Sequence, residues 1–146
     1  MKRIYQRVRS WAIPAFLTLF AFALFRFIVF VGYVPTESME PTLEAGSYIC
    51  GTRCFTNLEK GDVIVFTYKE QLLVKRIYAC PGDEVNLCEL KYMTNHPIPI
   101  WEDPILQIPT DSYFVLGDNT ENSFDSRYWD NPFIHEEDIV AKIWIP

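Results

Sequence analysis

The segment Trp11–Tyr33, WAIPAFLTLFAFALFRFIVFVGY, is the longest apolar stretch of this 146-residue sequence. Twenty of its 23 residues are apolar or glycine, so the segment has no polar face of the kind that a buried core helix shows. At about 1.5 Å per residue, a helix of this length would cross a hydrocarbon core of about 30 Å. We therefore predict a transmembrane anchor over residues 11–33.

The nature and the outer limit of this anchor are separate questions. A cleaved export signal has an apolar core of about 7–15 residues and then a pattern of small residues. Here the apolar run is longer and is followed by Phe, Ile, Val, Tyr and Pro, which favours an uncleaved anchor. Its outer limit stays open between Arg26 and Tyr33, because Arg26 could extend its guanidinium to the interface. Residues 27–34, FIVFVGYV, would then form the first strand of the next domain.

Charge is distributed unevenly along the chain. Residues 1–10 carry four basic side chains and no acid, which predicts a cytoplasmic N-terminus with the rest of the chain outside. From Val34 onward there are 8 basic and 19 acidic residues, a balance of −11. A domain this acidic is a poor partner for nucleic acid, whose binding depends on neutralising phosphates. We therefore expect no nucleic-acid partner. Membrane lipid is an expected partner because of the anchor.

Residues 34–146 are predicted to form one mainly β domain, because short β-branched and aromatic runs alternate with Gly, Pro, Asn and Asp. The segment His96–Pro109 contains four prolines and is expected to be extended and irregular. No amphipathic helical stretch of ten or more residues follows Tyr33. The expected strands are Ser47–Cys50, Asp62–Tyr68, Leu72–Tyr78, Tyr113–Leu116 and Ile139–Ile145.

The four cysteines are Cys50, Cys54, Cys80 and Cys88. An outer location permits disulfides, and four cysteines allow three connectivities among which the sequence does not choose. A Cys80–Cys88 bridge would close a short loop, and free cysteines are the alternative. Metal binding is not expected, because the sequence has no CxxC motif and its two histidines lie apart.

Ser38 is a candidate nucleophile, although a serine near prolines is most often only a turn residue. Pro35 and Pro41 restrict the backbone around it, and a serine hydroxyl needs a base to become reactive. A histidine base is disfavoured, since His96 lies in a proline-rich stretch and His135 in an acidic one. Both histidines are expected at the surface.

Lys75 is the remaining candidate base. In the strand-like run LLVKRIY its side chain would point with Leu73 and Ile77, opposite to Val74 and Arg76. Burial on that apolar side would lower the lysine pKa, so that the amine could accept a proton near neutral pH. The ordinary explanation is a solvated lysine at a strand edge, and the pattern alone does not exclude it.

Four segments in order behind the anchor resemble the bacterial type I signal peptidases, membrane-anchored serine proteases that use a serine and a lysine. The resemblance covers residues 34–129. It is carried by VPTESMEPTL (34–43), GDVIVF (61–66), LVKRIYACPGD (73–83) and GDNTENSFDSRYW (117–129). It implies a signal-peptidase-like β-barrel or sheet fold and no cofactor or metal.

The resemblance also implies a role for each matching residue. Ser38 is expected to be the nucleophile and Lys75 the general base, with Thr36 and the Ser38 N–H forming the oxyanion hole. Ser123 matches the serine that orients the lysine amine. Asp125 and Arg127 match a supporting pair. The residues expected to line the substrate pockets are Val34, Pro35, Met39, Leu43 and Val74.

Some positions depart from the family pattern. Thr120 and Glu121 stand where Arg and Asp are usual, Asp130 replaces a Gly, and Glu37 replaces a small residue beside the nucleophile. Only 34 residues separate Asp83 from Asp118, where larger relatives carry an inserted domain, so a reduced cap is expected near residues 84–112. Part of this cap is expected to dip into the membrane surface through Ile98, Ile100 and Trp101.

The function implied is the cleavage of signal peptides from exported preproteins, after a small residue at −1, at the outer face of the cytoplasmic membrane. Two alternatives stay open. The chain could be a specialised relative that processes a narrow substrate set for a pilin, conjugation or secretion locus. It could also be a non-catalytic, membrane-anchored domain that binds peptides.

Overall fold

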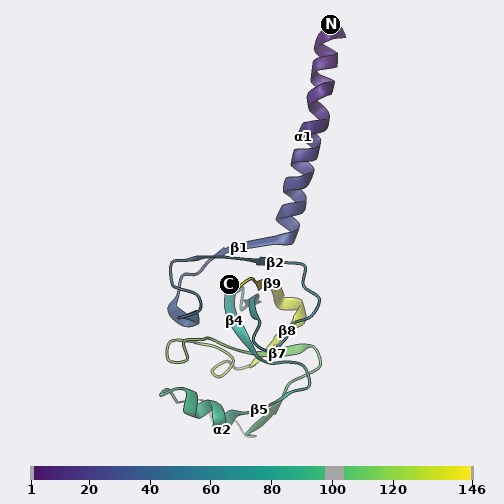
Figure 1. Ribbon diagram of the computed structural model, residues 1–146. Coiled ribbons are helices and arrows are strands. Elements are labelled where there is room, and N and C mark those ends of the chain that lie inside the picture. Colours follow the sequence, from purple (N-terminus) through teal and green to yellow (C-terminus); the bar gives the residue numbers. More distant parts are fainter. Residues whose placement is uncertain (1, 98–103, 146) are drawn as a thin grey trace.

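A computed structural model of the chain describes residues 2–97 and 104–145 (Figure 1). Helix α1, Lys2–Ile28, rises away from a β-rich body. Its portion Trp11–Ile28 has a mean hydropathy of 1.9, is fully exposed, and is long and apolar enough to cross a bilayer. The helix thus begins before the predicted anchor and ends between Arg26 and Tyr33, in the interval where the sequence leaves its limit open.

Strand β1, Val29–Tyr33, follows α1 with no residue between them. It pairs antiparallel with β2, Tyr48–Thr52, so these five residues belong to the sheet rather than to the helix. The composition VFVGY explains the change, because β-branched and aromatic residues fit a pleated, half-buried surface. Within the interval that the sequence leaves open, the helix itself ends at Ile28.

The body is built on a seven-stranded antiparallel sheet in the order β1-β2-β9-β3-β4-β7-β8. This confirms the mainly β fold. All five expected strands are present with bounds shifted by a few residues, whereas the short strand β8 was not expected. The remaining strands of this sheet are β3 Val63–Tyr68, β4 Gln71–Ala79, β7 Ser112–Leu116, β8 Phe133–His135 and β9 Ile139–Ile143.

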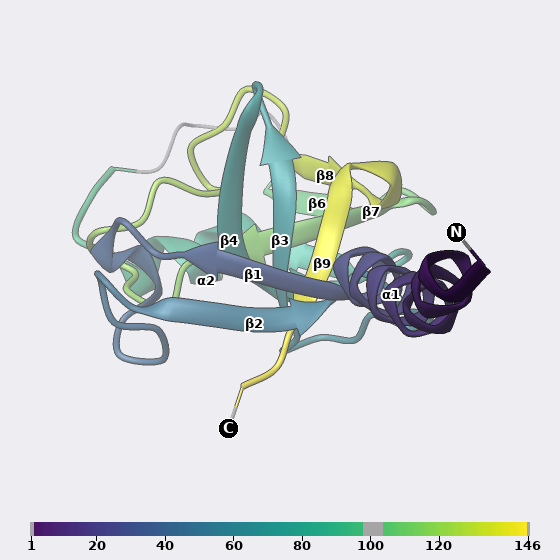
Figure 2. The same cartoon turned by 90° about the horizontal axis from the view of Figure 1, so that it is seen from above.

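The sheet curves strongly, so that β1 and β2 cross over β3, β4 and β9 (Figure 2). Gly51 makes this crossing close, because a Cβ at that position would clash with the backbone of Lys142 and Ile143 on β9. The curvature encloses an apolar core between the crossing strands. Its buried members are Phe30, Val34, Met39, Leu43, Ile49, Val63, Val65, Ala141 and Ile143.

A small second sheet pairs β5, Glu84–Asn86, with β6, Ile105–Gln107, at the end of the body opposite to α1. Helix α2, Leu87–Leu90, follows β5, and the Asn86 side chain caps it by accepting a hydrogen bond from the Cys88 N–H at 3.0 Å. Strand β6 shows that part of His96–Pro109 is paired rather than irregular. The expected membrane contacts Ile98, Ile100 and Trp101 lie outside the described residues. Short 3₁₀ helices span Glu37–Met39, Lys91–Met93 and Glu136–Asp138.

All four cysteines are free, so the Cys80–Cys88 bridge weighed from the sequence is not formed. Cys80 is half-buried against the apolar cluster between β3 and β7. Cys88 is exposed on α2, and Cys50 is exposed on β2.

Candidate active site

Ser38 lies in the 3₁₀ helix Glu37–Met39, directly after the turn that leaves β1. Its neighbour Met39 is fully buried in the core and fixes this short helix to the body. The Ser38 carbonyl accepts a hydrogen bond from the backbone N–H of Asn119 at 3.1 Å. The Asn119 side chain donates to the Glu37 carbonyl at 3.2 Å, so a distant loop holds the backbone on both sides of the hydroxyl.

Lys75 reaches Ser38 from strand β4, and its Nζ donates to Ser38 Oγ at 2.6 Å. Burial on β4 alternates, with Lys75, Ile77 and Ala79 inside, as the strand pattern predicted. Only 3% of Lys75 is exposed, and this burial lowers its pKa from 10.5 to about 8. The charge of Asp125 opposes the change, whereas that of Arg127 supports it. The two groups expected to form the dyad are therefore in contact, and the amine loses its proton at an accessible pH.

Thr36 stands two residues before Ser38, with its Oγ1 at 3.3 Å from Ser38 Oγ. Thr36 is the exposed residue that precedes the 3₁₀ helix, in extended conformation. A hydroxyl here can turn its hydrogen toward negative charge that develops beside the serine. This is the position that the resemblance gives to an oxyanion donor.

Ser123, Asp125 and Arg127 form a buried polar cluster behind the dyad. The Asp125 carboxylate accepts from Ser123 Oγ at 2.6 Å, from the Gly117 N–H at 2.9 Å, and from Arg127 Nε at 2.8 Å. Asp125 and Arg127 are both fully buried, so their ion pair is shielded from solvent. Among the described residues the Ser123 hydroxyl bonds to Asp125 and not to Lys75. The role of Ser123 in orienting the amine therefore stays a prediction.

Gly117 explains how this cluster lies so close to Ser38. A Cβ on Gly117 would clash with the Ser38 carbonyl on one side and with the Ser123 side chain on the other. Only glycine lets the loop after β7 pass between these two residues. The contact brings residues 117–123 against a serine that is about 80 positions earlier in the chain.

Three residues of the quoted motifs have positioning contacts that the sequence reasoning missed. Arg76, next to Lys75, forms a two-pronged ion pair with Asp118, with Nε at 2.7 Å and Nη2 at 2.6 Å from the carboxylate oxygens. Its Nη2 also donates to Thr42 Oγ1 at 3.2 Å. After Arg76 and Asp118, Asn119 is the third such residue, through its hydrogen bonds to the carbonyls of residues 37 and 38. The only hint in the sequence was the pair of opposite charges in KRI and GDN. These charges are 42 residues apart, so no local pattern connects them.

Two hollows meet at the dyad. The first, which we call the β1–β4 groove, lies between β1 and the first half of β4, and its walls are mostly apolar. The second, which we call the distal hollow, lies toward the hairpin that joins β3 and β4. Thr36, Ser38, Leu73 and Lys75 line both. The groove is further lined by residues including Phe30, Val31, Tyr33, Pro35, Ile49 and Val74, and the distal hollow by Tyr68, Lys69, Gln71, Asn122 and Phe124.

The residues predicted to line the substrate pockets fall into two groups. Pro35 and Val74 line the β1–β4 groove. Val34, Met39 and Leu43 are buried in the core cluster that includes the groove residue Val65, and they do not line the groove. They support the site from below. The sequence pattern did not distinguish the residues that line the groove from those buried beneath it, because it gives no information on how deeply a residue lies.

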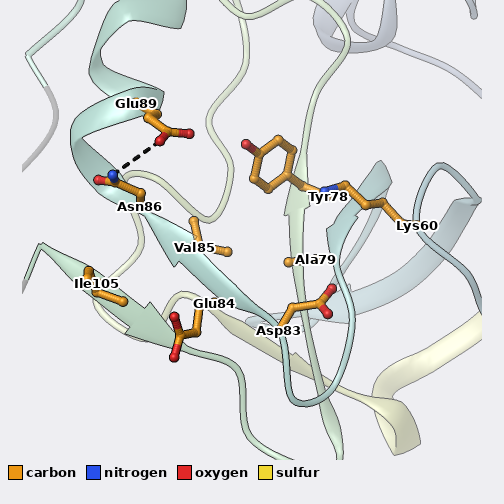
Figure 3. A pocket seen from close by; sticks show the side chains of 9 residues that line it. All are labelled: Lys60, Tyr78, Ala79, Asp83, Glu84, Val85, Asn86, Glu89 and Ile105. Carbon is orange, nitrogen blue, oxygen red and sulfur yellow. Dashed lines mark hydrogen bonds between the residues drawn. The ribbon is translucent and has the colours of Figure 1, made fainter.

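A third hollow lies away from the dyad, at the small sheet (Figure 3). It is edged by the acidic side chains of Asp83, Glu84 and Glu89, and the Lys60 amine lies 4.9 Å above the Tyr78 ring. None of the dyad residues lines it. In the part of the chain that the structure describes, no group of three His, Cys, Asp or Glu side chains is placed to hold a metal ion.

Both histidines lie away from the dyad, as expected of surface residues. His135 Nδ1 is 3.1 Å from Ser112 Oγ on the far edge of the sheet. His96 lies 3.9 Å from the carboxylate of Glu121, one of the departures from the family pattern. Glu121 also accepts hydrogen bonds from Asn95, so it fastens the segment after α2 to the site loop.

The other departures have surface or backbone roles. Asp130 pairs with Lys69 at 3.5 Å, with both side chains largely exposed. Thr120 contributes its carbonyl, which accepts from Arg127 Nη2 at 3.1 Å, so its side chain is not part of this contact. Nothing in the structure explains why glutamate stands at position 37.

Comparison with known proteins gives consistent matches over nearly the whole chain. A family model described as "Signal peptidase, peptidase S26" matches residues 8–99 and 90–146. A probable signal peptidase I-2 of Synechocystis sp. is 30% identical over 139 residues, which cover 82% of this chain and 63% of that protein. Signal peptidase I of Leptolyngbya laminosa is 29% identical, and the match covers 80% of this chain and 67% of that protein. Signal peptidase I of Bacillus amyloliquefaciens is 29% identical, and the match covers 82% of this chain and 77% of that protein. The chain thus spans about two thirds of the first two relatives.

Proposed function

We propose, from the premise that this chain belongs to the signal peptidase family (peptidase S26), that it is a serine endopeptidase which cleaves signal peptides through Ser38 and Lys75. One observation carries the proposal. Lys75 Nζ lies 2.6 Å from Ser38 Oγ, inside a site where burial lowers the lysine pKa to about 8. A neutral amine in hydrogen-bond contact with a hydroxyl is the arrangement that a lysine general base requires.

The reaction follows from this contact. Neutral Lys75 takes the proton from Ser38 Oγ as the oxygen attacks the scissile carbonyl carbon. The Thr36 hydroxyl and the Ser38 N–H donate to the oxyanion that forms. The Lys75 ammonium then gives its proton to the leaving amine, and an acyl-enzyme ester remains on Ser38. Lys75 next removes a proton from water, and the resulting hydroxide attacks the ester carbonyl. The ester bond to Ser38 Oγ breaks, the signal peptide leaves as a carboxylic acid, and Lys75 returns its proton to Ser38 Oγ.

The substrate would bind as an extended strand in the β1–β4 groove. Strand β4 pairs with β7 only from Arg76 onward, so its residues 71–75 have a free edge toward the groove. An added strand would use this edge and place its −1 and −3 side chains on the same side. Thr36 and Leu73 line the groove beside the dyad. We propose small residues at −1 and −3, as the family resemblance implies.

Location follows from α1 and the charge pattern. We propose that α1 crosses the cytoplasmic membrane once, with residues 1–10 in the cytoplasm and the catalytic domain outside. The exposed face of β1 and β2 would then contact lipid, since it adjoins the end of α1 and is apolar. We call it the β1–β2 outer face and define it by Val31, Tyr33, Tyr48 and Cys50.

The test uses the full chain in detergent micelles with an exported preprotein. Wild-type protein should release the signal peptide, and N-terminal sequencing of the product should place the cut after a small residue. Ser38→Ala and Lys75→Met should each lower turnover by about 10²-fold or more. The methionine variant is informative because it removes a buried amine without leaving a cavity.

The stability of Lys75→Met separates chemistry from folding. A folded-state pKa lowered to about 8 means that the protonated lysine destabilises the native state at pH 7. The variant should therefore be at least as resistant to thermal unfolding as the wild type at that pH. Full cleavage by either folded variant would refute the dyad, and the alternative of a non-catalytic peptide-binding domain would be favoured if the wild type cut nothing.

A further inference from the structure

We propose that the distal hollow receives the first residues after the scissile bond, and that Lys69 gives it a preference for an acidic residue there. The inference rests on the proposed peptidase function and adds a determinant of specificity on the leaving side of the substrate. It comes from the two hollows that share the dyad and from the different chemistry of their walls.

The direction of the substrate follows from where each hollow leads. The β1–β4 groove runs from the dyad along Phe30 and Val31, toward the end of α1, and its walls are mostly apolar, with Arg53 beside Phe30 as a charged member. The apolar part of a signal peptide lies in the membrane, so the residues before the cut belong in this groove. A chain that passes the dyad and continues then enters the distal hollow, whose lining includes Tyr68, Lys69 and Gln71 of the β3–β4 hairpin.

Lys69 is held at the edge of the distal hollow by its turn. Tyr68 and Gln71 are the last paired residues of β3 and β4, and Lys69 and Glu70 between them both have positive φ, at 46° and 65°. A two-residue turn of this kind fixes the position of both side chains on a rigid hairpin. Lys69 lines the hollow and Glu70 does not.

The charge of Lys69 is available to a substrate. Its only ion-pair partner among the described residues is Asp130, at 3.5 Å, and the two side chains are 69% and 96% exposed. Such an exposed pair is weak and is easily exchanged for another carboxylate. The neighbouring Tyr68 and then Asp130 raise the pKa of Lys69, so the amine is fully protonated at neutral pH.

The remaining walls suit an extended peptide. Tyr68 and Phe124 offer aromatic surfaces, and the Phe124 ring is stacked on Tyr128. Gln71 and Asn122 have exposed side-chain amides, for which the described residues provide no hydrogen-bond partner. These amides can form hydrogen bonds with the backbone of a bound peptide, while the Lys69 ammonium attracts an acidic side chain of that peptide. Residues 34–146 carry a balance of −11, so this local cation is needed for an acidic residue to bind.

The test is a series of quenched fluorescent peptides with small residues at −1 and −3 and with Glu, Gln or Lys at +1 or +2. Wild-type full-length protein should give kcat/KM values about two- to five-fold higher for Glu than for Lys, and high salt should reduce the difference. Lys69→Glu should reverse the order of the kcat/KM values, and Lys69→Gln should make them equal for all peptides.

Lys60→Glu is the matched control, because it changes the net charge by the same amount in the hollow remote from the dyad (Figure 3). It should leave the order of the peptides unchanged. An equal effect of Lys69→Glu and Lys60→Glu, or equal cleavage of all peptides by the wild type, would overturn the inference and leave the proposed function intact. Absence of any cleavage would refute the proposed function itself. The affinities of the same peptides for the Ser38→Ala protein should follow the order of the wild-type kcat/KM values. Equal affinities for all peptides would also overturn the inference.

Discussion

The ammonium group of Lys75 loses most of its hydration when β4 enters the sheet, and Ser38 supplies the contact that the amine retains. Burial favours the neutral amine, which is the form that can accept a proton. Among the nearby charges, Asp125 and Asp118 favour the ammonium and Arg127 disfavours it, so burial is the main cause of the lowered pKa. The surrounding apolar strands, rather than a single charged neighbour, therefore adjust this base.

The first prediction concerns the pH dependence of cleavage. Lys75 must be neutral to act, so the rate of acylation should be low below its pKa and should rise with pH through a single ionisation at about 8. The measurement is single-turnover cleavage of a peptide between pH 6 and 10. His135→Ala, which changes a residue remote from the dyad, should leave the profile unchanged. An inflection that this variant removes would instead identify a histidine base.

At this scale the sequence predicted the buried position of Lys75 but not the residues that hold the proposed dyad in place. The alternation in LLVKRIY correctly placed Lys75 on the buried side with Ile77. The roles of Ser38 and Thr36 came from the resemblance; the structure places Ser38 Oγ against the amine and Thr36 Oγ1 beside Ser38 Oγ. Arg76 and Asn119 received no role, because their contacts join segments that are brought together only by the fold.

At the scale of elements, the site depends on the loop after β7 more than on any strand. This loop contributes Gly117 and Asp118, and each contacts a different segment. The strands were largely predictable from β-branched and aromatic runs, whereas β5, β6 and β8 have three residues each and are too short for a periodic pattern. The loop was recognisable only as a motif, and the sequence did not show what it packs against.

The second prediction tests this loop. Gly117→Ala should remove most activity, because a Cβ there must displace either the Ser38 carbonyl or the Ser123 side chain. The comparison is Gly82→Ala, where a Cβ meets open space but φ is +85°. Gly82→Ala should cost only about 1–2 kcal/mol of stability and keep its kcat. Peptide cleavage and thermal unfolding of both full-length variants give the result, and normal kcat in Gly117→Ala would contradict the close packing.

At the scale of the whole molecule, the two ends of the body are built from different elements. The β1–β2 outer face adjoins α1, and the backbone N–H of the exposed Trp144 donates to the Cys50 carbonyl at the same end. The small sheet and α2 lie at the opposite end. The apolar run and the basic N-terminus predicted an anchor, but the sequence did not predict which face of the body would lie beside it.

The third prediction uses the cysteines that these two ends provide. In single-cysteine variants reconstituted into phospholipid vesicles, a nitroxide on Cys50 should be more accessible to oxygen than to a water-soluble nickel chelate. A nitroxide on Cys88, which is exposed on α2, should show the opposite order. Power-saturation electron paramagnetic resonance measures both. Equal accessibility to the chelate at the two positions would exclude lipid contact by the β1–β2 outer face.

The direct junction between Ile28 and Val29 has a mechanical consequence. A helix that passes into a paired strand without a linker cannot act as a tether, so the body cannot swing freely above the bilayer. In the proposed topology, Ser38 then works at a fixed height, ten residues beyond the end of the helix. Enzyme and substrate would meet by lateral diffusion in a plane, already aligned, and the position of a cut would be measured from the membrane surface.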